Sequence, residues 1–328
     1  MGEVGDVMRF AAMAILLLAG TAQASAGEAC PGNPDALGTS RTLAVDPAAF
    51  PRIGQIQYRK TLPLNDHEVV ITFDDGPLPP YSDRVLDTLA AECVKATYFL
   101  VGQMARAYPH TVRRIYNAGH TIGTHTQHHP FGFDQLGHPR VEGEVKGGIA
   151  AVKAALGDAQ AVSPFFRIPG LARSRQVETY LASQQLAVWS ADEVADDWIR
   201  GVGAKEIVAR AIRRLEARDH RGVLLLHDIQ PATAMALPAL LRALKAKGYR
   251  VVQAVPLGER PKSVPEPVGE PLVANGGWPR IAKASSSART AHHLRKLLVA
   301  RRPRTAPVAS LAGTDYYTAG RNWQLSQF

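Results

Sequence analysis

The chain has 328 residues, a length that suits one large domain or two modest ones. Hydrophobic residues make up 46% and charged residues 20%, as in a globular protein with a buried core, and two cysteines are too few for a disulfide framework. The net charge of +9 is uneven: from Pro261 onward ten Lys and Arg stand against three Asp and Glu, a surplus of seven that leaves residues 1–260 only +2. The basic character therefore belongs to the C-terminal tail.

The N-terminus has the pattern of an export signal. An apolar run over residues 11–19, followed by Ala24-Ser25-Ala26, predicts a signal peptide over residues 1–26 that is cleaved after Ala26. The run is too short for a comfortable membrane span, although an uncleaved anchor is the alternative. A start at Met8 would give the leader its usual positive charge. We therefore expect a secreted or periplasmic, cell-envelope protein, which argues against nucleic acid as a partner.

Residues 27–66 are rich in Pro, Gly and small polar residues, which predicts an extended lead-in that wraps onto the domain. Residues 67–257 then alternate β-branched runs with helical periods, which predicts an α/β fold with a parallel sheet, open or closed into a barrel. The seven predicted strands are 69–73, 96–101, 120–124, 165–168, 186–190, 223–226 and 249–252. The predicted helices are 82–92, 109–118, 140–156, 175–184, 204–217 and 234–247. Whether Cys30 and Cys93 pair is left open.

Ionisable residues follow most of the predicted strands. In α/β barrels the rim at the carboxyl ends of the strands is where binding and catalytic groups gather. Because these residues come from separate strands, we expect them to form one site at that rim. They are Asp74, Asp75, His125, Arg167, Asp192, His227 and Asp228.

Two of these segments together predict a metal site. The turn Gly76-Pro77 directs the carboxylates of Asp74 and Asp75 into the mouth of the barrel, where they repel unless a cation or a proton lies between them. The alternative is that they cap backbone amides of the turn. His125 and His129 are four residues apart, which on a helical turn places both imidazoles on one side. One Asp with two His leaves open positions for water and substrate, as a catalytic zinc site requires. A solvated His-rich turn is the alternative.

His227 supplies a proton donor. It ends the apolar run over residues 222–226, so its imidazole emerges at the rim and could protonate a leaving group near neutral pH. A core histidine bonded to backbone is the alternative. Arg167 could hold a carboxylate by a bidentate pair, and Asp197 could orient His227.

Five segments now occur in order: Thr72-Phe73-Asp74-Asp75-Gly76-Pro77, His125-Thr126-x-x-His129, Arg167-x-Pro169, Asp197-Trp198 and Leu226-His227-Asp228. They resemble the five motifs of the polysaccharide deacetylase, or NodB-homology, family over roughly residues 67–255. The resemblance implies an irregular (β/α) barrel of about seven parallel strands. It also implies a hydrolase that removes acetyl groups from an N- or O-acetylated polysaccharide, with an N-acetylglucosamine polymer as the expected substrate.

The resemblance implies a role for each matching position. Asp74 would be the general base that activates water, positioned by Arg167. His227 would protonate the leaving group, tuned by Asp197. One divalent metal ion, usually zinc, would be held by Asp75, His125 and His129. The acetyl and substrate pocket would be lined by Pro169, Gly170, Trp198 and Leu226.

Two positions depart from the family pattern. Gly170 stands where members often carry a tyrosine, so the backbone amide is kept but a ring that shapes the groove is lost. Asp192 precedes Asp197 by five residues instead of three, which predicts a longer loop beside the acetyl pocket and leaves the role of Asp192 open.

Two other functions fit the same scaffold. A non-catalytic glycan-binding domain is disfavoured because Asp74 and His227 are both present. An amidase acting on a small amide is disfavoured because the metal set is retained together with Asp197-Trp198.

The C-terminal part of the chain is predicted to lie outside the catalytic domain. Residues 258–328 begin with a Pro-rich linker and continue as a basic, polar stretch that we expect to be disordered. Its composition favours a solvated tail without a partner, and attraction of its charge to an anionic cell envelope is the alternative.

Overall fold

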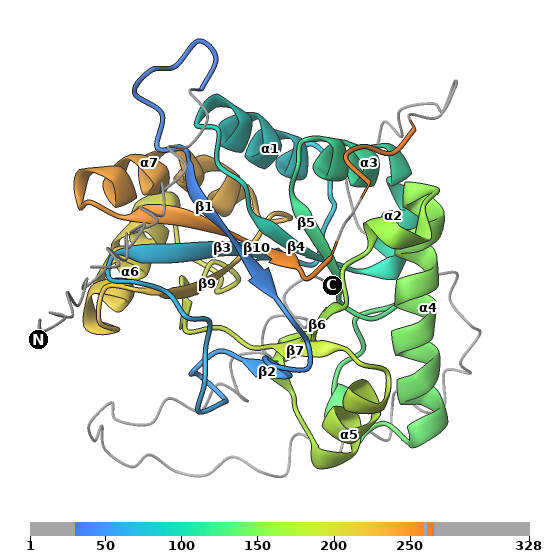
Figure 1. Ribbon diagram of the computed structural model, residues 1–328. Coiled ribbons are helices and arrows are strands. Elements are labelled where there is room, and N and C mark those ends of the chain that lie inside the picture. The colour runs from blue at the N-terminus through green and yellow to red at the C-terminus, as the bar shows by residue number, and fades with distance from the viewer. Residues whose placement is uncertain (1–29, 259–260, 266–328) are drawn as a thin grey trace, which may run out of the picture.

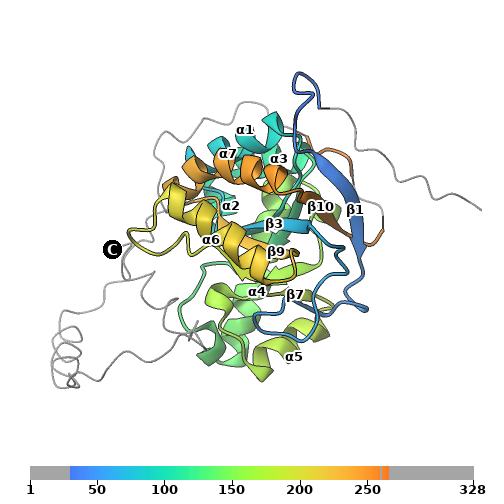
Figure 2. The ribbon, with the colours of Figure 1, turned by 90° about the vertical axis from the view of Figure 1, so that its left-hand side faces the viewer.

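Ten strands, all paired in parallel, and the helices around them make up the part of the chain that the structure describes. This structure is a computed structural model, and it describes residues 30–258 and 261–265 (Figure 1, Figure 2). The predicted signal peptide and nearly all of the basic tail lie outside the described residues. Across those described ranges, the helices are all too short or too polar to traverse a membrane.

The elements follow one another in an α/β order. The strands are β1 (Thr39–Val45), β2 (Arg52–Ile53), β3 (Glu68–Asp74), β4 (Thr97–Leu100), β5 (Thr121–Thr124), β6 (Phe165–Arg167), β7 (Ala187–Trp189), β8 (Glu193–Val194), β9 (Gly222–His227) and β10 (Arg250–Pro256). The helices are α1 (Tyr81–Ala91), α2 (Gly102–Ala107), α3 (Pro109–Asn117), α4 (His138–Leu156), α5 (Arg175–Ser183), α6 (Ala204–Ala217) and α7 (Pro231–Ala246). Short 3₁₀ turns are η1 (Phe133–Gln135), η2 (Ala159–Ala161) and η3 (Pro169–Leu171).

The strand β3 lies at the centre of the sheet and sets the position of the site. The strand order is β1-β10-β3-β4-β5-β6-β7-β2, while β9 pairs with both β3 and β8. In the register between β3 and β9, Asp74 lies opposite His227. Because all pairs are parallel, the carboxyl ends of the strands meet at one rim, as the sequence predicts.

Alternate residues of β3 face two different cores, since side chains of a strand alternate with period two. Val69, Ile71 and Phe73 pack in the cluster formed with helices α1, α3, α6 and α7. Val70 points to the inner face, into a cluster that contains Phe99 and Trp189 from neighbouring strands. Thr72 and Asp74 have the same parity as Val70, so they continue the inner face toward the rim.

The lead-in is part of the sheet, which the sequence does not predict. Its first segment, β1, pairs with β10, and its second, β2, pairs with β7. Both strands lie among Pro and Gly residues, and β2 has only two residues, so neither has a detectable period. Among the described residues, no pairing joins β2 to β8, so strand pairing leaves a seam in the barrel.

The domain also extends beyond its predicted C-terminal boundary. Val264 is 3% exposed and packs in the cluster beneath the helices. The Asn117 side chain, at the end of α3, donates to the Val264 carbonyl at 3.0 Å and accepts from its N–H at 2.7 Å. Residues 261–265, which the sequence assigns to the Pro-rich linker, are therefore fixed to α3 by a buried valine and two hydrogen bonds.

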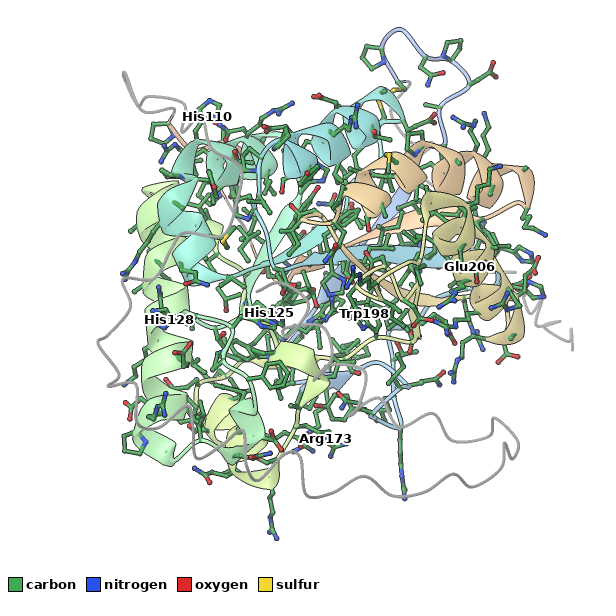
Figure 3. All side chains as sticks on the ribbon, turned by 180° about the vertical axis from the view of Figure 1, so that it is seen from behind. His110, His125, His128, Arg173, Trp198 and Glu206 are labelled. Carbon is green, nitrogen blue, oxygen red and sulfur yellow. A yellow bond between two sulfur atoms is a disulfide. The ribbon has the colours of Figure 1, made fainter. Side chains whose placement is uncertain are left out.

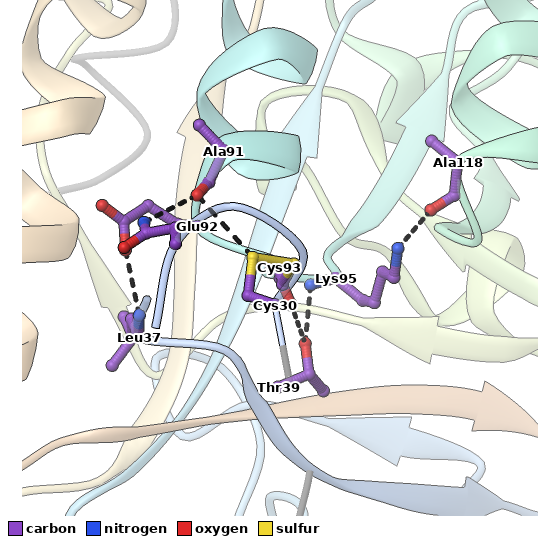
Figure 4. The surroundings of a disulfide bond; sticks show 9 residues. Cys30, Leu37, Thr39, Ala91, Glu92, Cys93, Lys95 and Ala118 are labelled. Carbon is purple, nitrogen blue, oxygen red and sulfur yellow. Dashed lines mark hydrogen bonds between the residues drawn. A yellow bond between two sulfur atoms is a disulfide. The ribbon is translucent and has the colours of Figure 1, made fainter. Parts of the chain in front are cut away.

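A disulfide attaches the beginning of the described chain to the domain. Cys30 and Cys93 are bonded, with their Cα atoms 5.6 Å apart, at the end of α1 (Figure 4). Asn33 donates to the Ala91 carbonyl at 2.9 Å, and Glu92 accepts from the Leu37 N–H at 2.9 Å. The structure thus decides the pairing that the sequence leaves open.

Removal of this disulfide is expected to lower the stability of the domain. The bond spans a sequence separation of 63 residues. A cross-link of that length restricts the unfolded chain, so the double variant Cys30→Ser with Cys93→Ser should lose about 2–4 kcal/mol of unfolding free energy. Urea denaturation followed by circular dichroism measures the loss. Equal midpoints for the oxidised wild type and the variant would contradict the expectation.

Candidate metal and acid–base site

Asp74 and Asp75 lie at the rim where β3 ends. Asp75 has a positive φ of 76° and precedes the cis peptide bond Gly76-Pro77. Both carboxyl groups are buried, with residue exposures of 3% for Asp74 and 0% for Asp75. Neither carboxylate oxygen of Asp75 has a hydrogen-bond partner among the described residues. A buried carboxylate without donors is costly unless a cation compensates its charge.

Two imidazoles face the Asp75 carboxylate. The Nε2 atoms of His125 and His129 lie 3.4 Å and 3.3 Å from Asp75 Oδ1. The candidate ligand atoms of these three residues all lie within 4.8 Å of one another. The structure therefore brings together the three residues predicted to bind a metal.

The two imidazoles do not approach through a helical turn, and that part of the prediction is wrong. Residues 125–132 contain no helix. Instead, Thr126 and His129 adopt positive φ angles of 66° and 52°, which fold the segment back on itself. The Thr126 hydroxyl accepts from the His129 N–H at 3.0 Å and fixes this bend.

The orientation of the imidazoles suits metal binding. His125 Nδ1 lies 2.7 Å from the Arg167 carbonyl oxygen, which can only accept, so Nδ1 carries a proton and Nε2 is the nitrogen turned toward Asp75. Burial lowers the pKa of His129 to about 4, so its ring is neutral. Burial raises the pKa of Asp75, but the neighbouring imidazoles, His129 foremost, hold it well below its usual range. Two imidazole nitrogens with one carboxylate oxygen are a donor set that zinc accepts.

Glu144 on α4 orders the histidine-bearing segment, which the sequence does not reveal. Its carboxylate accepts from the backbone N–H groups of Gln127 at 3.1 Å and His128 at 2.8 Å. It also lies 2.9 Å from His128 Nδ1. No motif connects Glu144 with a segment about fifteen residues earlier, so only the folded chain shows the contact.

Arg167 fixes the carboxylate of Asp74. One guanidinium nitrogen, Nη1, donates to Asp74 Oδ1 at 2.6 Å and to the Thr72 hydroxyl at 2.9 Å. The other, Nη2, donates to the Ser190 carbonyl at 2.9 Å, so the predicted bidentate pair does not form. The guanidinium is fully buried and lies over the Phe99 ring, 4.2 Å from its centroid. Such a buried, charged partner holds the Asp74 carboxylate in place.

His227 is held by Asp197, as the sequence predicts. His227 Nδ1 lies 2.8 Å from Asp197 Oδ1. Asp197 Oδ2 accepts from the His227 N–H at 2.7 Å and from the Thr233 hydroxyl at 2.6 Å. Thr233, on α7, is a further contact that no sequence pattern indicates.

The charges around His227 favour its protonated form. Burial lowers the pKa of His227, but the carboxylates of Asp197, Asp75 and Asp74 outweigh burial and raise it to about 9. Its Nε2 atom lies 3.9 Å from Asp75 Oδ2, on the side of the metal-binding residues. The arrangement presents an N–H donor to anything bound between His227 and Asp74.

An apolar surface lies beside His227, but Leu226, one of the residues predicted to line it, is absent from it. The Trp198 ring meets the His227 ring edge-on, with centroids 5.4 Å apart, and packs on Ala191, Val194 and Leu225. Leu226 instead belongs to the cluster beneath the helices, so its predicted place in the pocket is wrong. The reason is strand alternation: residues 225 and 227 share one face of β9, and residue 226 faces the opposite way.

The remaining predicted pocket residues form the turn η3 after β6. Pro169 is buried. Gly170 is exposed with a φ of 57°, and a side chain there would meet nothing within 4 Å. Leu171 packs against the cluster of Ala191, Val194 and Leu225. In Figure 3, Trp198 and His125 lie near the centre of the molecule and Arg173 lies below them.

Comparison with known proteins gives relatives and solved structures of the same architecture. The polysaccharide deacetylase family model matches residues 61–189. A peptidoglycan-N-acetylglucosamine deacetylase of Bacillus cereus is 32% identical over 211 residues, which cover 62% of this chain and 72% of that protein. A chitooligosaccharide deacetylase of Sinorhizobium fredii is 31% identical over 220 residues, 62% of this chain and 98% of that protein.

Solved structures give the same result. A peptidoglycan deacetylase of Bdellovibrio bacteriovorus matches with a TM-score of 0.58 and 31% identity, over 66% of this chain and 59% of that chain. A protein of Bacillus anthracis described as a pseudoenzyme of family CE4 matches with a TM-score of 0.52 and 23% identity, over 58% of this chain and 64% of that one. Since the fold is shared with a pseudoenzyme, the residues of the site carry the functional argument.

Proposed function

The chain belongs to the polysaccharide deacetylase family, and we propose that it hydrolyses acetyl groups from an acetylated polysaccharide, with an N-acetylglucosamine polymer as the expected substrate. The observation that carries the proposal is the meeting of three groups at one rim: the carboxylate and two imidazoles of Asp75, His125 and His129, the Asp74–Arg167 pair, and the His227–Asp197 pair. The relatives named above, which act on peptidoglycan or chitooligosaccharide, support the choice of sugar.

Asp75, His125 and His129 would hold a divalent ion, for which zinc is the expected identity. The buried carboxylate of Asp75 supports this fit: its oxygens have no hydrogen-bond partner in the described part of the chain, and a cation would compensate its charge. When bound, such an ion would act as a Lewis acid toward the acetyl carbonyl and would stabilise the negative charge that develops on its oxygen.

Asp74 would act as the general base. Arg167 occupies its Oδ1, so Oδ2 is the oxygen available to take a proton from the attacking water. His125 Nε2 lies 3.9 Å from that Oδ2, which places the oxygen next to the predicted metal ligands. The bond from Arg167 holds the carboxylate in position to accept that proton.

His227 would act as the general acid. Its Nε2–H would pass a proton to the leaving nitrogen, or to the oxygen of an O-acetyl group, as the bond to the acetyl carbon breaks. The bond from Nδ1 to Asp197 holds the ring in place and stabilises its positive charge. Trp198 and Leu225, beside this ring, would contact the acetyl methyl.

A panel of acetylated glycans tests the proposal. Purified protein should release acetate from at least one of N-acetylglucosamine oligomers, peptidoglycan or acetylated xylan, and the product should contain the free amine or hydroxyl. Hydrolysis of small amides alone would indicate the amidase alternative. Binding of the glycans without any acetate release would indicate the non-catalytic alternative.

We also propose that the protein acts outside the cytoplasm, in the periplasm or cell envelope or as a secreted protein. The leader-like N-terminus and the Cys30–Cys93 disulfide support this location, since disulfides persist in oxidising compartments. The basic tail would then meet anionic envelope polymers. Cell fractionation with N-terminal sequencing tests the location, and the expected mature terminus follows Ala26.

The Glu144→Gln variant should weaken metal binding without changing the ligands. The amide retains the size of the carboxylate but removes the charge that attracts the N–H groups of Gln127 and His128. Residues that orient ligands typically contribute about 10–100-fold to metal affinity, and we expect a loss in that range. Competition with a zinc-binding dye measures the affinity. An affinity equal to that of the wild type would show that the segment holds its shape without this charge.

A further inference from the structure

One segment of the lead-in, residues 54–60, reaches the same rim as the catalytic groups. We call it the lead-in loop. The strand before it, β2, pairs in parallel with β7, and Ile53 lies opposite Trp189 in that register. The loop therefore leaves the sheet at the rim, where the Ile56 N–H donates to the Ala191 carbonyl at 3.0 Å. Ser190, the preceding residue, is the one whose carbonyl binds Arg167.

The lead-in loop is bonded to the turn that carries Gly170. The Gln57 side-chain amide donates to the Leu171 carbonyl at 2.6 Å. In return, the Arg173 guanidinium donates to the Gln57 carbonyl at 2.7 Å. Two hydrogen bonds in opposite directions hold the loop and the turn side by side.

An apolar surface runs from the lead-in loop to the acid–base residues. Ile56, Leu171 and Trp198 are each partly buried and pack on the same cluster of Ala191, Val194 and Leu225. Trp198 in turn contacts the His227 ring. These three partly exposed side chains thus gather around one small cluster beside the reacting groups. Apolar surfaces with an aromatic ring suit the carbon faces of sugar rings.

Asp192 fixes both ends of the lead-in loop. Its carboxylate is fully buried and accepts from the Gln55 N–H at 2.7 Å, the Thr61 hydroxyl at 2.6 Å and the Val223 N–H at 2.7 Å. Gln55 lies at the beginning of the loop, Thr61 directly follows it and Val223 belongs to β9, so this one carboxylate bridges the seam between β2 and β8. Gly54 brings the chains close enough, because a Cβ there would lie 2.6 Å from the Ala191 nitrogen.

We propose that the lead-in loop is one wall of the substrate groove and binds sugars that neighbour the acetylated one, with Asp192 as the residue that positions it. This inference rests on the proposed function for the identity of the sugar. It assigns Asp192 a purpose and predicts that the enzyme acts on oligosaccharides better than on a monosaccharide. Ile56 packs on the same cluster as Trp198, and Gln57 bonds the loop to the turn.

Binding and hydrolysis of an N-acetylglucosamine tetramer test the proposal, with the monosaccharide N-acetylglucosamine as comparison. The variants are Ile56→Ala and, as matched control, Ile149→Ala, which truncates a partly buried isoleucine packed on a different cluster. Calorimetry in an Asp74→Asn background gives Kd for the tetramer without turnover. We expect Ile56→Ala to raise Kd for the tetramer in the Asp74→Asn background, and KM for the tetramer in the otherwise wild-type protein, about tenfold. Its kcat, metal content and monosaccharide turnover should stay close to those of the wild type.

Each outcome decides the proposal. Equal tetramer affinity in Ile56→Ala and Ile149→Ala overturns the proposal, and so does the absence of tetramer binding by the Asp74→Asn protein. An equal loss toward tetramer and monosaccharide overturns the assignment to neighbouring sugars. Weaker binding in Ile56→Ala without acetate release from the wild type would support the wall and refute the proposed hydrolysis. Asp192→Asn should shift tetramer Kd in the same direction if it folds; an unchanged Kd in folded protein overturns its positioning role.

Discussion

The variant Asp74→Asn is expected to release acetate about 10²–10⁴-fold more slowly than the wild type, because it lacks the general base. Its bound metal should stay at the wild-type level, because it keeps every predicted metal ligand. The asparagine oxygen can still accept from Arg167, whose Nη1 lies 2.6 Å from Asp74 Oδ1 in the wild type. An amide cannot take the proton from water at neutral pH, so hydrolysis stops at its first proton transfer. The three predicted ligands Asp75, His125 and His129 are untouched.

Two measurements on the same sample decide this prediction. Acetate release from a glycan that the wild type hydrolyses gives the rate, and atomic absorption gives the metal per chain. Loss of both together would contradict the division of roles between Asp74 and Asp75. Activity within tenfold of the wild type would show that Asp74 is not the base.

Replacing His125 by alanine should remove metal and activity together. The His125 ring is buried and donates through Nδ1 to the Arg167 carbonyl, so Nε2 is fixed toward Asp75. Its loss leaves one imidazole and one carboxylate, too few protein ligands for a catalytic zinc site. We expect metal affinity to fall by at least about 10²-fold and acetate release to fall with it.

His128→Ala is the matched control for this variant, since it removes a histidine from the same segment. The His128 side chain is 52% exposed and bonds to Glu144 instead of pointing to Asp75. The backbone bonds that hold the segment remain. Metal content and activity should therefore stay near the wild-type values. A His125→Ala variant that retains metal and turnover as well as His128→Ala does would show that the ion is held elsewhere.

The strand ends were predictable because their signals are local. A buried apolar run followed by Asp74 or His227 places those side chains at the carboxyl end of a strand, and parallel pairing brings the ends together. The register between β3 and β9 confirms this for Asp74 and His227. The metal set and the Asp197 partner of His227 are likewise where the motifs predict them.

Other features depend on the folded chain. Glu144 and Thr233 reach the site from helices whose sequence shows only ordinary amphipathic periods. The sequence could have shown that Leu225, and not Leu226, lies beside His227, because the period of two in a strand places residue 225 on the same face as His227. The sequence could not have shown the strands β1 and β2, since they pair with distant segments and have little pattern of their own. Asp192 shows the same limit: its three donors lie far away in the sequence.

The shared fold does not by itself establish catalysis, since a CE4 pseudoenzyme has the same architecture. Acetate release before and after metal removal is the most direct test of whether this chain is a metal-dependent deacetylase. Purified protein should release acetate from an acetylated glycan, lose that activity on treatment with a chelator, and regain it when zinc is restored. Acetate release that chelation leaves unchanged would contradict the metal dependence, and no release from any acetylated glycan by zinc-loaded protein would contradict the deacetylase function.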